Sequence, residues 1–415
     1  MKACCLAALW FCGGAIGARA ADEFFDRVGD ALSVSAAQGQ FRARLSGMLD
    51  FEAYEFQPVA PGVIHADGDT LLNPRLALFL DAQAGRQVYF FAQARFDRGF
   101  DPADAPGEVR LDEYALRITP WADGRASLQI GRFATVVGSW ANRHSSWVNP
   151  FITAPLPYEN LTGVWDSEAI RSSGILLAWS HVRPGLPQRI VAMEKRLRLP
   201  IVWGPSYATG VALSGVVEKF QYAFELKHAS LSSRPESWGR TQGDWDHPTV
   251  SGRVGYRPNQ MWTLGLSGSA GPYLLPGAPT LLVPRRDRGD YRQLVIGQDV
   301  GFAWHHLQVW GEVFAARFEI PIVGHADTLA YYVEAKYKFT PQFFGALRWN
   351  EQLFGAISDR GASVRWGLPA TRLDLGAGYR FTAHTQLKLQ YNLQQGDVPG
   401  RPNGHMLGGQ MTLRF

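Results

Sequence analysis

Enzyme chemistry is the first question that the sequence raises, because a few polar side chains of catalytic or metal-binding type lie close together. A hydrolase would use a base beside a hydroxyl group, and a cation site would use clustered carboxylates. Residues of these types lie at His144-Ser145-Ser146, at Asp67 and Asp69, and at Asp244, Asp246 and His247. A catalytic triad is defined by geometry rather than by adjacency in sequence, and each cluster also fits a solvated polar loop, the interpretation that we favour. We therefore expect no catalytic residue, no metal ion and no cofactor.

The composition excludes several other classes of protein. All three cysteines of the 415 residues, Cys4, Cys5 and Cys12, lie near the first residue. The rest of the chain therefore has no disulfide, no thiolate metal site and no covalently attached c-type haem. The formal net charge of +4 gives no electrostatic footprint for nucleic acid. No apolar run of about eighteen residues follows the first segment, which excludes a bundle of membrane-spanning helices.

Residues 1–20 have the arrangement of a secretory signal peptide. A basic start at Lys2 is followed by an apolar stretch and by Ala18-Arg19-Ala20. This small-x-small site predicts cleavage after Ala20, so that the chain would leave the cytoplasm through the inner membrane.

The segment that follows, residues 21–39, fits no strand. Phe24, Val28 and Leu32 are spaced as on one face of a short helix. The segment is therefore either a periplasmic helix or partial plug, or a frayed terminus. The sequence gives both interpretations equal support.

From residue 40 onward, the dominant pattern is an alternation of apolar and polar residues with a period of two. In Thr328–Thr340, for example, Leu329 and Val333 lie on one face, while Glu334 and Lys336 lie on the other. Successive side chains of a strand point to opposite faces, so each segment has one apolar and one polar face. Short turns alternate with long loops, as in an up-and-down antiparallel sheet whose two ends differ.

This pattern predicts an all-β fold for residues 40–415, a transmembrane antiparallel up-and-down β-barrel with short periplasmic turns and long external loops. We count about eighteen strands, Arg189–Leu199 among them, or sixteen if weaker segments such as Gly174–Val182 and Ala208–Val217 are not strands. A soluble sandwich or propeller could also bury an apolar face, but the sequence shows no linker, no shift of composition and no internal repeat. Aromatic residues gather beside the short turns, where a girdle at the membrane interface would lie.

The last ten positions, Met406–Phe415, alternate in the same way and end in an aromatic residue. They resemble the C-terminal strand of bacterial outer-membrane proteins, which ends in Phe and is read by the barrel-assembly machinery. The resemblance implies that Phe415 is an assembly signal. It also implies that the chain resides in the outer membrane, in contact with the lipid bilayer and lipopolysaccharide.

A second resemblance concerns Ala126–Phe133, which ends in Gly131-Arg132-Phe133. It is similar to the strand that precedes the third external loop of general bacterial porins, a loop that folds inward and narrows the channel. The long segment 138–172 follows here, and its charged residues are the predicted constriction: Arg143, His144, Glu159, Asp166, Glu168 and Arg171. The segment is rich in Trp and Pro where porins usually carry acidic residues, so an ordinary external or interface loop is the alternative. The porin resemblance also implies a homotrimer.

A barrel of this size is too wide for side chains to fill and encloses water. Inward basic residues predicted to line the pore are Arg42, Arg44, Arg75, Arg95, Arg117, Arg196, Arg198, Arg348, Arg372 and Arg380. Basic residues slightly outnumber acidic ones on this face, which predicts a weak anion preference. Pairing of these charges across strands would weaken it.

These observations favour a porin that lets small hydrophilic solutes diffuse passively across the outer membrane. One alternative is a barrel that sheathes a multihaem cytochrome as an electron conduit, with the periplasmic or cytochrome partner filling the lumen. A barrel hydrolase is the second alternative. None of the three involves nucleic acid.

Overall fold

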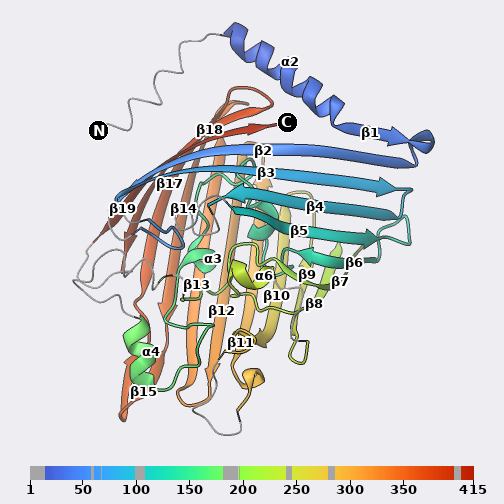
Figure 1. Cartoon of the computed structure of the whole chain (residues 1–415). Helices are drawn as coiled ribbons and strands as arrows, with labels where there is room; N and C mark the ends of the chain where they lie inside the picture. The colour runs from blue at the N-terminus through green and yellow to red at the C-terminus, as the bar shows by residue number, and fades with distance from the viewer. Residues whose placement is uncertain are drawn as a thin grey trace.

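The computed structural model describes residues 15–57, 60–66, 68–98, 108–180, 195, 197–239, 245–278, 286–396 and 403–415. Within these residues, seventeen strands form one antiparallel sheet, and all of them except β1 close into a barrel of sixteen strands. The seam joins the last strand to the first barrel strand, where Gly47 and Phe415 exchange two backbone hydrogen bonds of 3.0 and 3.1 Å. The ribbon in Figure 1 shows this curved wall, with the first and last barrel strands side by side.

The barrel strands follow one another around the wall in chain order. They are β2 (Phe41–Phe56), β3 (Thr70–Ala84), β4 (Val88–Asp97), β5 (Glu108–Ile118), β6 (Ser127–Phe133), β7 (Ala208–Val217), β8 (Phe220–Lys227), β9 (Thr249–Tyr256), β10 (Trp262–Pro272), β11 (Arg292–Trp304), β12 (Leu307–Ile320), β13 (Gly324–Lys338), β14 (Phe343–Phe354), β17 (Ala370–Arg380), β18 (Thr385–Gln395) and β19 (Gly404–Arg414). A separate hairpin, β15 (Ala356–Asp359) and β16 (Ala362–Arg365), lies in the connection between β14 and β17.

The strand number is the lower of the two predicted from the sequence, because two expected strands do not form. Gly174–Val182 falls on helix α4 (Ser173–Ser180). The described part of Arg189–Leu199 contains only an isolated bridge from Arg198 to Trp165. Ala208–Val217, the other weak segment, is strand β7.

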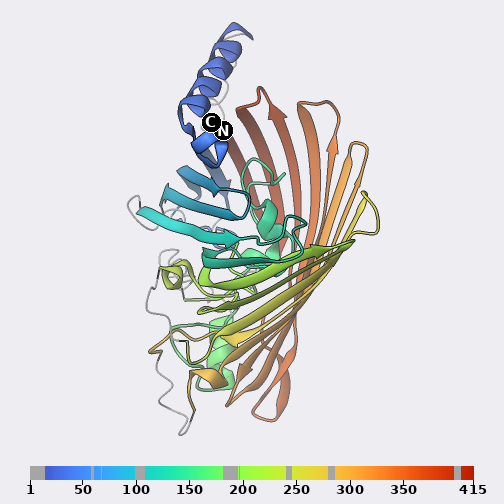
Figure 2. The ribbon, with the colours of Figure 1, turned by 90° about the vertical axis from the view of Figure 1, so that its right-hand side faces the viewer.

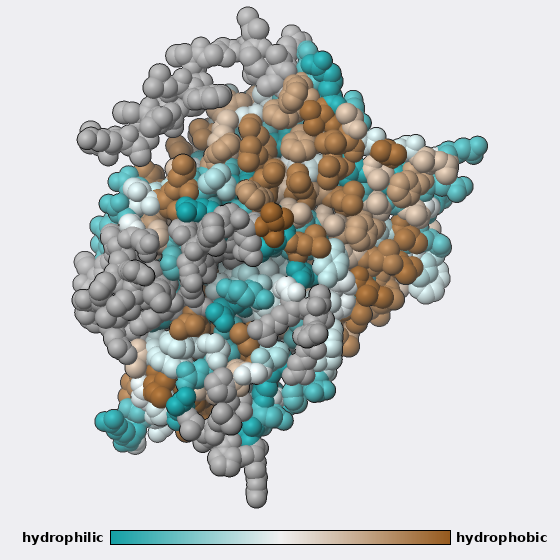
Figure 3. All heavy atoms as spheres, in the orientation of Figure 1, coloured by the Kyte–Doolittle hydropathy of each residue, from teal (hydrophilic) through white to brown (hydrophobic). Residues whose placement is uncertain are grey.

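The predicted alternation of faces is confirmed along the barrel wall. On β13, the apolar Leu329 and Val333 are exposed, whereas Tyr332 and Glu334 are buried inside. Figure 3 shows apolar side chains gathered on the outer surface over β2–β5. Monomeric soluble proteins rarely expose contiguous apolar patches of this extent, so this outer surface fits a non-aqueous environment.

The two ends of the barrel differ, as the spacing of turns predicted. Helix α2 (Ala15–Ala31) and the C-terminus lie at the end with the short turns (Figures 1 and 2). Strand β1 (Ser33–Ala36) pairs with the first residues of β2, beyond the point where β19 stops. Of the predicted N-terminal segment 21–39, therefore, the first part is helical and the rest forms a hairpin with β2. Of the predicted signal peptide, residues 1–14 lie outside the described residues.

Across the described residues, none of the helices has both the length and the apolar content that a membrane-spanning helix requires.

The connection between β6 and β7, residues 134–207, crosses the interior of the barrel. It contains the short helices η2 (Trp140–Arg143) and α3 (Leu156–Glu159), in addition to α4. Helix α3 packs against β13 and β14. Figures 1 and 2 both show α3 on the concave side of the wall. The connection therefore extends beyond the predicted loop 138–172 at both ends and supplies much of the protein core.

Candidate functional site

The β6–β7 connection is held to the inner wall by a carboxylate on β12. Glu312 accepts hydrogen bonds from the Trp140 backbone N–H (2.8 Å), the Ser139 hydroxyl (2.7 Å) and the Tyr158 hydroxyl (2.5 Å). Glu312 is 2% exposed, so its carboxylate has lost its hydration. These hydrogen bonds replace the ones that water would otherwise donate to it. Ser139, Trp140 and Tyr158 of the connection are thereby held at one point of the wall.

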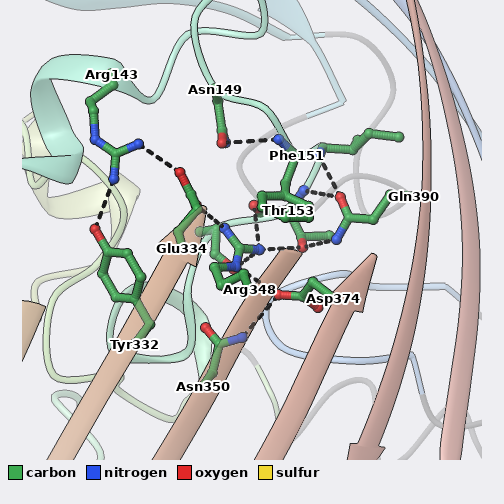
Figure 4. A network of polar contacts seen from close by, with 12 residues as sticks. Arg143, Asn149, Phe151, Thr153, Tyr332, Glu334, Arg348, Asn350, Asp374 and Gln390 are labelled. Atoms are coloured by element: carbon green, nitrogen blue, oxygen red, sulfur yellow. Dashed lines mark hydrogen bonds and ion pairs between the residues drawn. The ribbon is translucent and has the colours of Figure 1, made fainter. Parts of the chain in front are cut away.

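A second anchor is the arginine at the centre of Figure 4. Arg348 on β14 donates to Asp374 (2.6 Å) and Glu334 (3.3 Å) on the neighbouring strands. Its remaining terminal nitrogen donates to the backbone carbonyls of Thr153 (3.1 Å) and Ala154 (3.2 Å) in the connection. The Arg348 side chain is completely buried, and such charge-assisted bonds are the stronger kind in proteins.

The same network includes two of the predicted constriction residues. Arg143 donates to Glu334 (2.8 Å) and to the Tyr332 hydroxyl (3.0 Å), as Figure 4 shows. Glu159 forms an ion pair with Arg372, which also contacts Asp374 at 2.9 Å. Arg143 and Glu159, which the sequence predicts at the constriction, therefore form ion pairs that hold the connection to the wall.

Hydrogen bonds from β18 and apolar contacts complete this attachment. On β18, Lys388 donates to the carbonyls of Asn149 and Phe151, each at 3.0 Å, and Gln390 donates to the Thr153 hydroxyl at 2.8 Å. Next to them lies an apolar cluster from both the connection and the wall: Val137, Trp140, Tyr158, Ile201, Val202, Leu231, Val295, Phe314, Ala316, Ala330 and Tyr332. The half of the lumen along β11–β18 is thus filled by the chain itself.

The opposite side of the lumen keeps an open cleft of about 170 Å³ between the connection and strands β2–β4. Arg75 spans Asp50 (3.4 Å) and Glu52, while Tyr54 and Asn73 donate to Glu52 at 2.8 and 2.9 Å. A water needs roughly 10–15 Å³ of such space, so the 170 Å³ of the cleft has room for about 11–17 waters. The cleft thus places charged and amide side chains of the wall opposite the connection.

The predicted constriction residues divide into two groups. Arg143, His144, Glu159 and Asp166 are inside the barrel or at its mouth with the long loops, and Asp166 pairs with Arg234 at 2.8 Å. Glu168 and Arg171 instead pair with each other at 2.6 Å, with side chains 32% and 48% exposed. The structure does not bring that pair to the network around Arg348.

The predicted pore-lining basic residues have different surroundings. Arg348 and Arg372 face inward but are covered by the connection, so the expectation that they line open water is corrected. Arg198 lies in the connection rather than on a strand, and Arg196 lies outside the described residues. Arg75 and Arg95 border the cleft, whereas residues nearer the short turns are Arg42, Arg44, Arg117 and Arg380.

Arg110 and Asp112 were missed as inward-facing residues because β5 contains an irregularity. The register of β4 with β5 shifts by one residue between Gln93 and Ala94, which moves the part of β5 before Glu113 to the other face. Arg110 consequently bonds to Asp97 and Asp112, each at 3.0 Å, inside the barrel. A strict period of two cannot find such residues, although Arg-Leu-Asp-Glu interrupts the alternation in the sequence.

The clusters considered for catalysis or metal binding are not arranged for it. His144 Nδ1 lies 2.6 Å from the Ala141 carbonyl and Nε2 lies 3.1 Å from the Tyr207 hydroxyl, while the Ser146 hydroxyl donates to Asp50. His144 and Ser146 thus use other partners. No group of three acidic, His or Cys residues suited to a metal ion occurs among the described residues, which leave out Asp67 and Asp244.

Burial lowers the pKa of His144 to about 4, because a charged imidazolium would lose its hydration. Both nitrogens of the neutral ring are hydrogen-bonded if Nδ1 donates to the Ala141 carbonyl and Nε2 accepts from the Tyr207 hydroxyl. An unfolded chain takes up the proton near pH 6.5, before the folded one does. The stabilisation is therefore complete above pH 6.5 and is lost as the pH falls towards 4, by about 3 kcal/mol at most.

We expect this loss to appear in thermal unfolding of the detergent-solubilised barrel. The wild type should exceed His144→Gln in unfolding midpoint at neutral pH, and the difference should shrink between pH 6.5 and pH 4. A comparison with the variant cancels the titration of other groups. A difference that stays constant over this range would contradict the role given to His144.

Comparison with known proteins supports the architecture. No protein-family model matches the sequence, and no curated protein matches it either. Among solved structures, the outer membrane channel DcaP of Acinetobacter baumannii superposes with a TM-score of 0.56 and 10% identity, over 92% of this chain and 100% of that one. An anion-selective porin from Comamonas acidovorans gives 0.52 at 11% identity, over 90% and 100%. The trimer form of OmpT, an outer membrane protein of Vibrio cholerae, gives 0.54 at 9% identity, over 90% and 99%. At these identities the likeness defines the fold, a porin-like β-barrel.

Proposed function

We propose that the protein is an outer-membrane channel through which small hydrophilic solutes diffuse. The observation that carries the proposal is the polar cleft between β2–β4 and the β6–β7 connection, inside a closed barrel whose outer face is apolar. The fold shared with DcaP and with the Comamonas porin supports it. The narrow cleft favours solutes no larger than small metabolites.

The filled lumen counts against the alternative of a cytochrome sheath. A haem protein could enter the barrel only if the β6–β7 connection left it, and Arg348 and Glu312 fasten that connection with buried bonds. The third possibility, a hydrolase, lacks support because His144 and Ser146 have other partners. Diffusion through the cleft needs neither rearrangement nor catalytic group.

The proposal also includes the route to the outer membrane, the oligomeric state and the ion preference of the channel. A signal peptide ending at Ala20 and a C-terminal Phe415 read by the assembly machinery fit delivery to the outer membrane, in contact with lipid and lipopolysaccharide. The trimer form of the Vibrio protein supports a homotrimer. A weak anion preference would now depend on Arg42, Arg44, Arg117 and Arg380, since Arg348 and Arg372 are neutralised by carboxylates.

Conductance of the purified protein in a planar bilayer tests the proposal. We expect discrete steps in KCl and a reversal potential that favours Cl⁻ in a salt gradient. An inserted, folded barrel that conducts nothing would refute the channel, and a reversal potential that favours K⁺ would refute the anion preference alone.

A substitution inside the cleft is expected to narrow it. Ala77 on β3 borders the cleft and is 7% exposed, so Ala77→Trp should lower the single-channel conductance to roughly half or less by filling the passage. Ala82→Trp on the outer face of the same strand is the matched control and should conduct like the wild type. Equal conductance of both variants would place the passage elsewhere in the lumen.

A further inference from the structure

The inner wall near the short turns is strongly basic, and the connection across the lumen lies beyond it. Inward positions at this end carry seven cations from β2, β5, β13, β17 and β19. They are Arg42, Arg44, Arg117, Lys336, Lys338, Arg380 and Arg414. We call this group the basic basin. It lies at the end where the chain termini are found, which the proposed function places in the periplasm.

The cations of the basin have no carboxylate partner among the described residues. The ion pairs inside the barrel involve other arginines, such as Arg75, Arg253 and Arg348. Asp81 faces the basin opposite Arg44 in register, but the Tyr89 hydroxyl donates to it. On α2, Asp26 contacts His384 of a turn at 3.1 Å. Positive charge therefore predominates inside this mouth of the barrel.

Neutral groups hold the central cations in place. The guanidinium groups of Arg414 and Arg380 lie 3.9 and 5.0 Å from the ring centre of Trp147, which belongs to the connection. Arg380 also donates to the Gln386 side chain (2.9 Å) and to the Trp147 carbonyl (3.2 Å). Arg414 donates to the Ala383 carbonyl (2.8 Å) through Nε alone. Each arginine thus retains terminal N–H groups for another acceptor.

This arrangement is electrostatically unfavourable without an anion. Arg414 is close enough to Arg44 and Arg380 to be repelled by both, and Arg42, Arg44 and Arg414 are exposed to the mouth. The electrostatic attraction between an anion and several nearby cations increases with the charge of the anion. Arginine moreover binds carboxylate and phosphate oxygens in a bidentate manner. A multivalent oxyanion would gain more here than chloride.

We propose that the basic basin is a binding site for small multivalent oxyanions, phosphate esters or oligocarboxylates, at the periplasmic mouth of the channel. This rests on the proposed function for its orientation in the membrane. Solutes of this class would be held just past the cleft between β2–β4 and the connection.

Pyrophosphate and citrate, each added to one side of a planar bilayer, test the site. We expect either anion to reduce the KCl current at lower concentration from the side of the short turns. In the double variant Arg380→Gln/Arg414→Gln, about tenfold more anion should be needed, since charged hydrogen bonds are lost. The control Arg286→Gln/Arg317→Gln makes the same change of net charge at the opposite end and should behave like the wild type.

Calorimetric binding of pyrophosphate to the detergent-solubilised barrel separates this proposal from the channel itself. Binding that is weakened in the Arg380/Arg414 variant supports the site even if no current flows, in which case only the channel function fails. Block by pyrophosphate alone assigns the site to phosphate groups, and block by citrate as well extends it to carboxylates. Conducting channels that neither anion blocks, or that both block equally in variant and wild type, would overturn the site.

Discussion

Arg348→Ala is expected to raise the single-channel conductance and to lower the unfolding midpoint of the same protein. The substitution leaves the buried carboxylates of Glu334 and Asp374 without their shared guanidinium. Glu334 keeps Arg143 and Asp374 keeps Arg372, so the loss should lie below the roughly 3–5 kcal/mol of a buried charge left without any partner. It also frees the carbonyls of Thr153 and Ala154, so the connection is released from the wall at its middle. The passage should widen because the released segment borders the cleft.

A matched control is Arg317→Ala, which breaks an exposed pair with Asp327. Exposed pairs contribute about 0–1 kcal/mol, so this variant should resemble the wild type in both measurements. Folding of each variant is checked by the shift in electrophoretic mobility on heating in SDS.

A gentler variant keeps the prediction testable if Arg348→Ala does not fold. Gln390→Ala removes the side chain that accepts from the Ile152 and Thr153 backbone N–H groups, and it leaves no unpaired charge. Folded Gln390→Ala or Arg348→Ala barrels with wild-type conductance would show that the connection does not restrict the passage.

The wall of the barrel was predictable because the alternation of apolar and polar residues is complete within each strand. Outward residues such as Leu329 and Val333 must be apolar whatever the rest of the chain does, so the pattern predicts faces and turns strand by strand. The pattern of the last strand is equally local, since the alternation of Met406–Phe415 lies within those ten residues. The prediction failed at the bulge in β5, which shifts the alternation at Arg110.

The interior was much less predictable, because its contacts join residues far apart in the chain. Gly174–Val182 is a short apolar run, and such runs suit a helix as well as a strand; it becomes α4, which lies against β15. Arg348 and Arg372 were correctly placed on the inner face. Their pairing depends on where Thr153, Ala154 and Glu159 fall, and a pattern of period two contains no information about that.

The glycine of the Gly131-Arg132-Phe133 motif has a structural role that the sequence did not reveal. Gly131 faces Ala115 across the β5–β6 pair and has a φ of 142°. A Cβ atom there would lie 2.2 Å from the Tyr114 carbonyl oxygen and 2.7 Å from the Ala115 Cα. The two backbones thus approach closely just before the chain leaves the wall after Phe133 and enters the lumen.

Gly131→Ala is therefore expected to reduce the yield of folded barrel severely. The unfavourable φ alone costs roughly 1–3 kcal/mol, and the overlap with backbone atoms, which cannot rotate away, adds to it. The yield is measured as the heat-sensitive band in SDS electrophoresis after refolding into detergent. Gly252→Ala on β9 is the control, because its nearest contact would be an ordinary 3.4 Å from the Ala223 carbonyl oxygen. If both variants refold equally well, the close β5–β6 approach does not determine where the connection enters the barrel, and its position must depend on the contacts to Glu312, Arg348 and the other anchors inside the lumen.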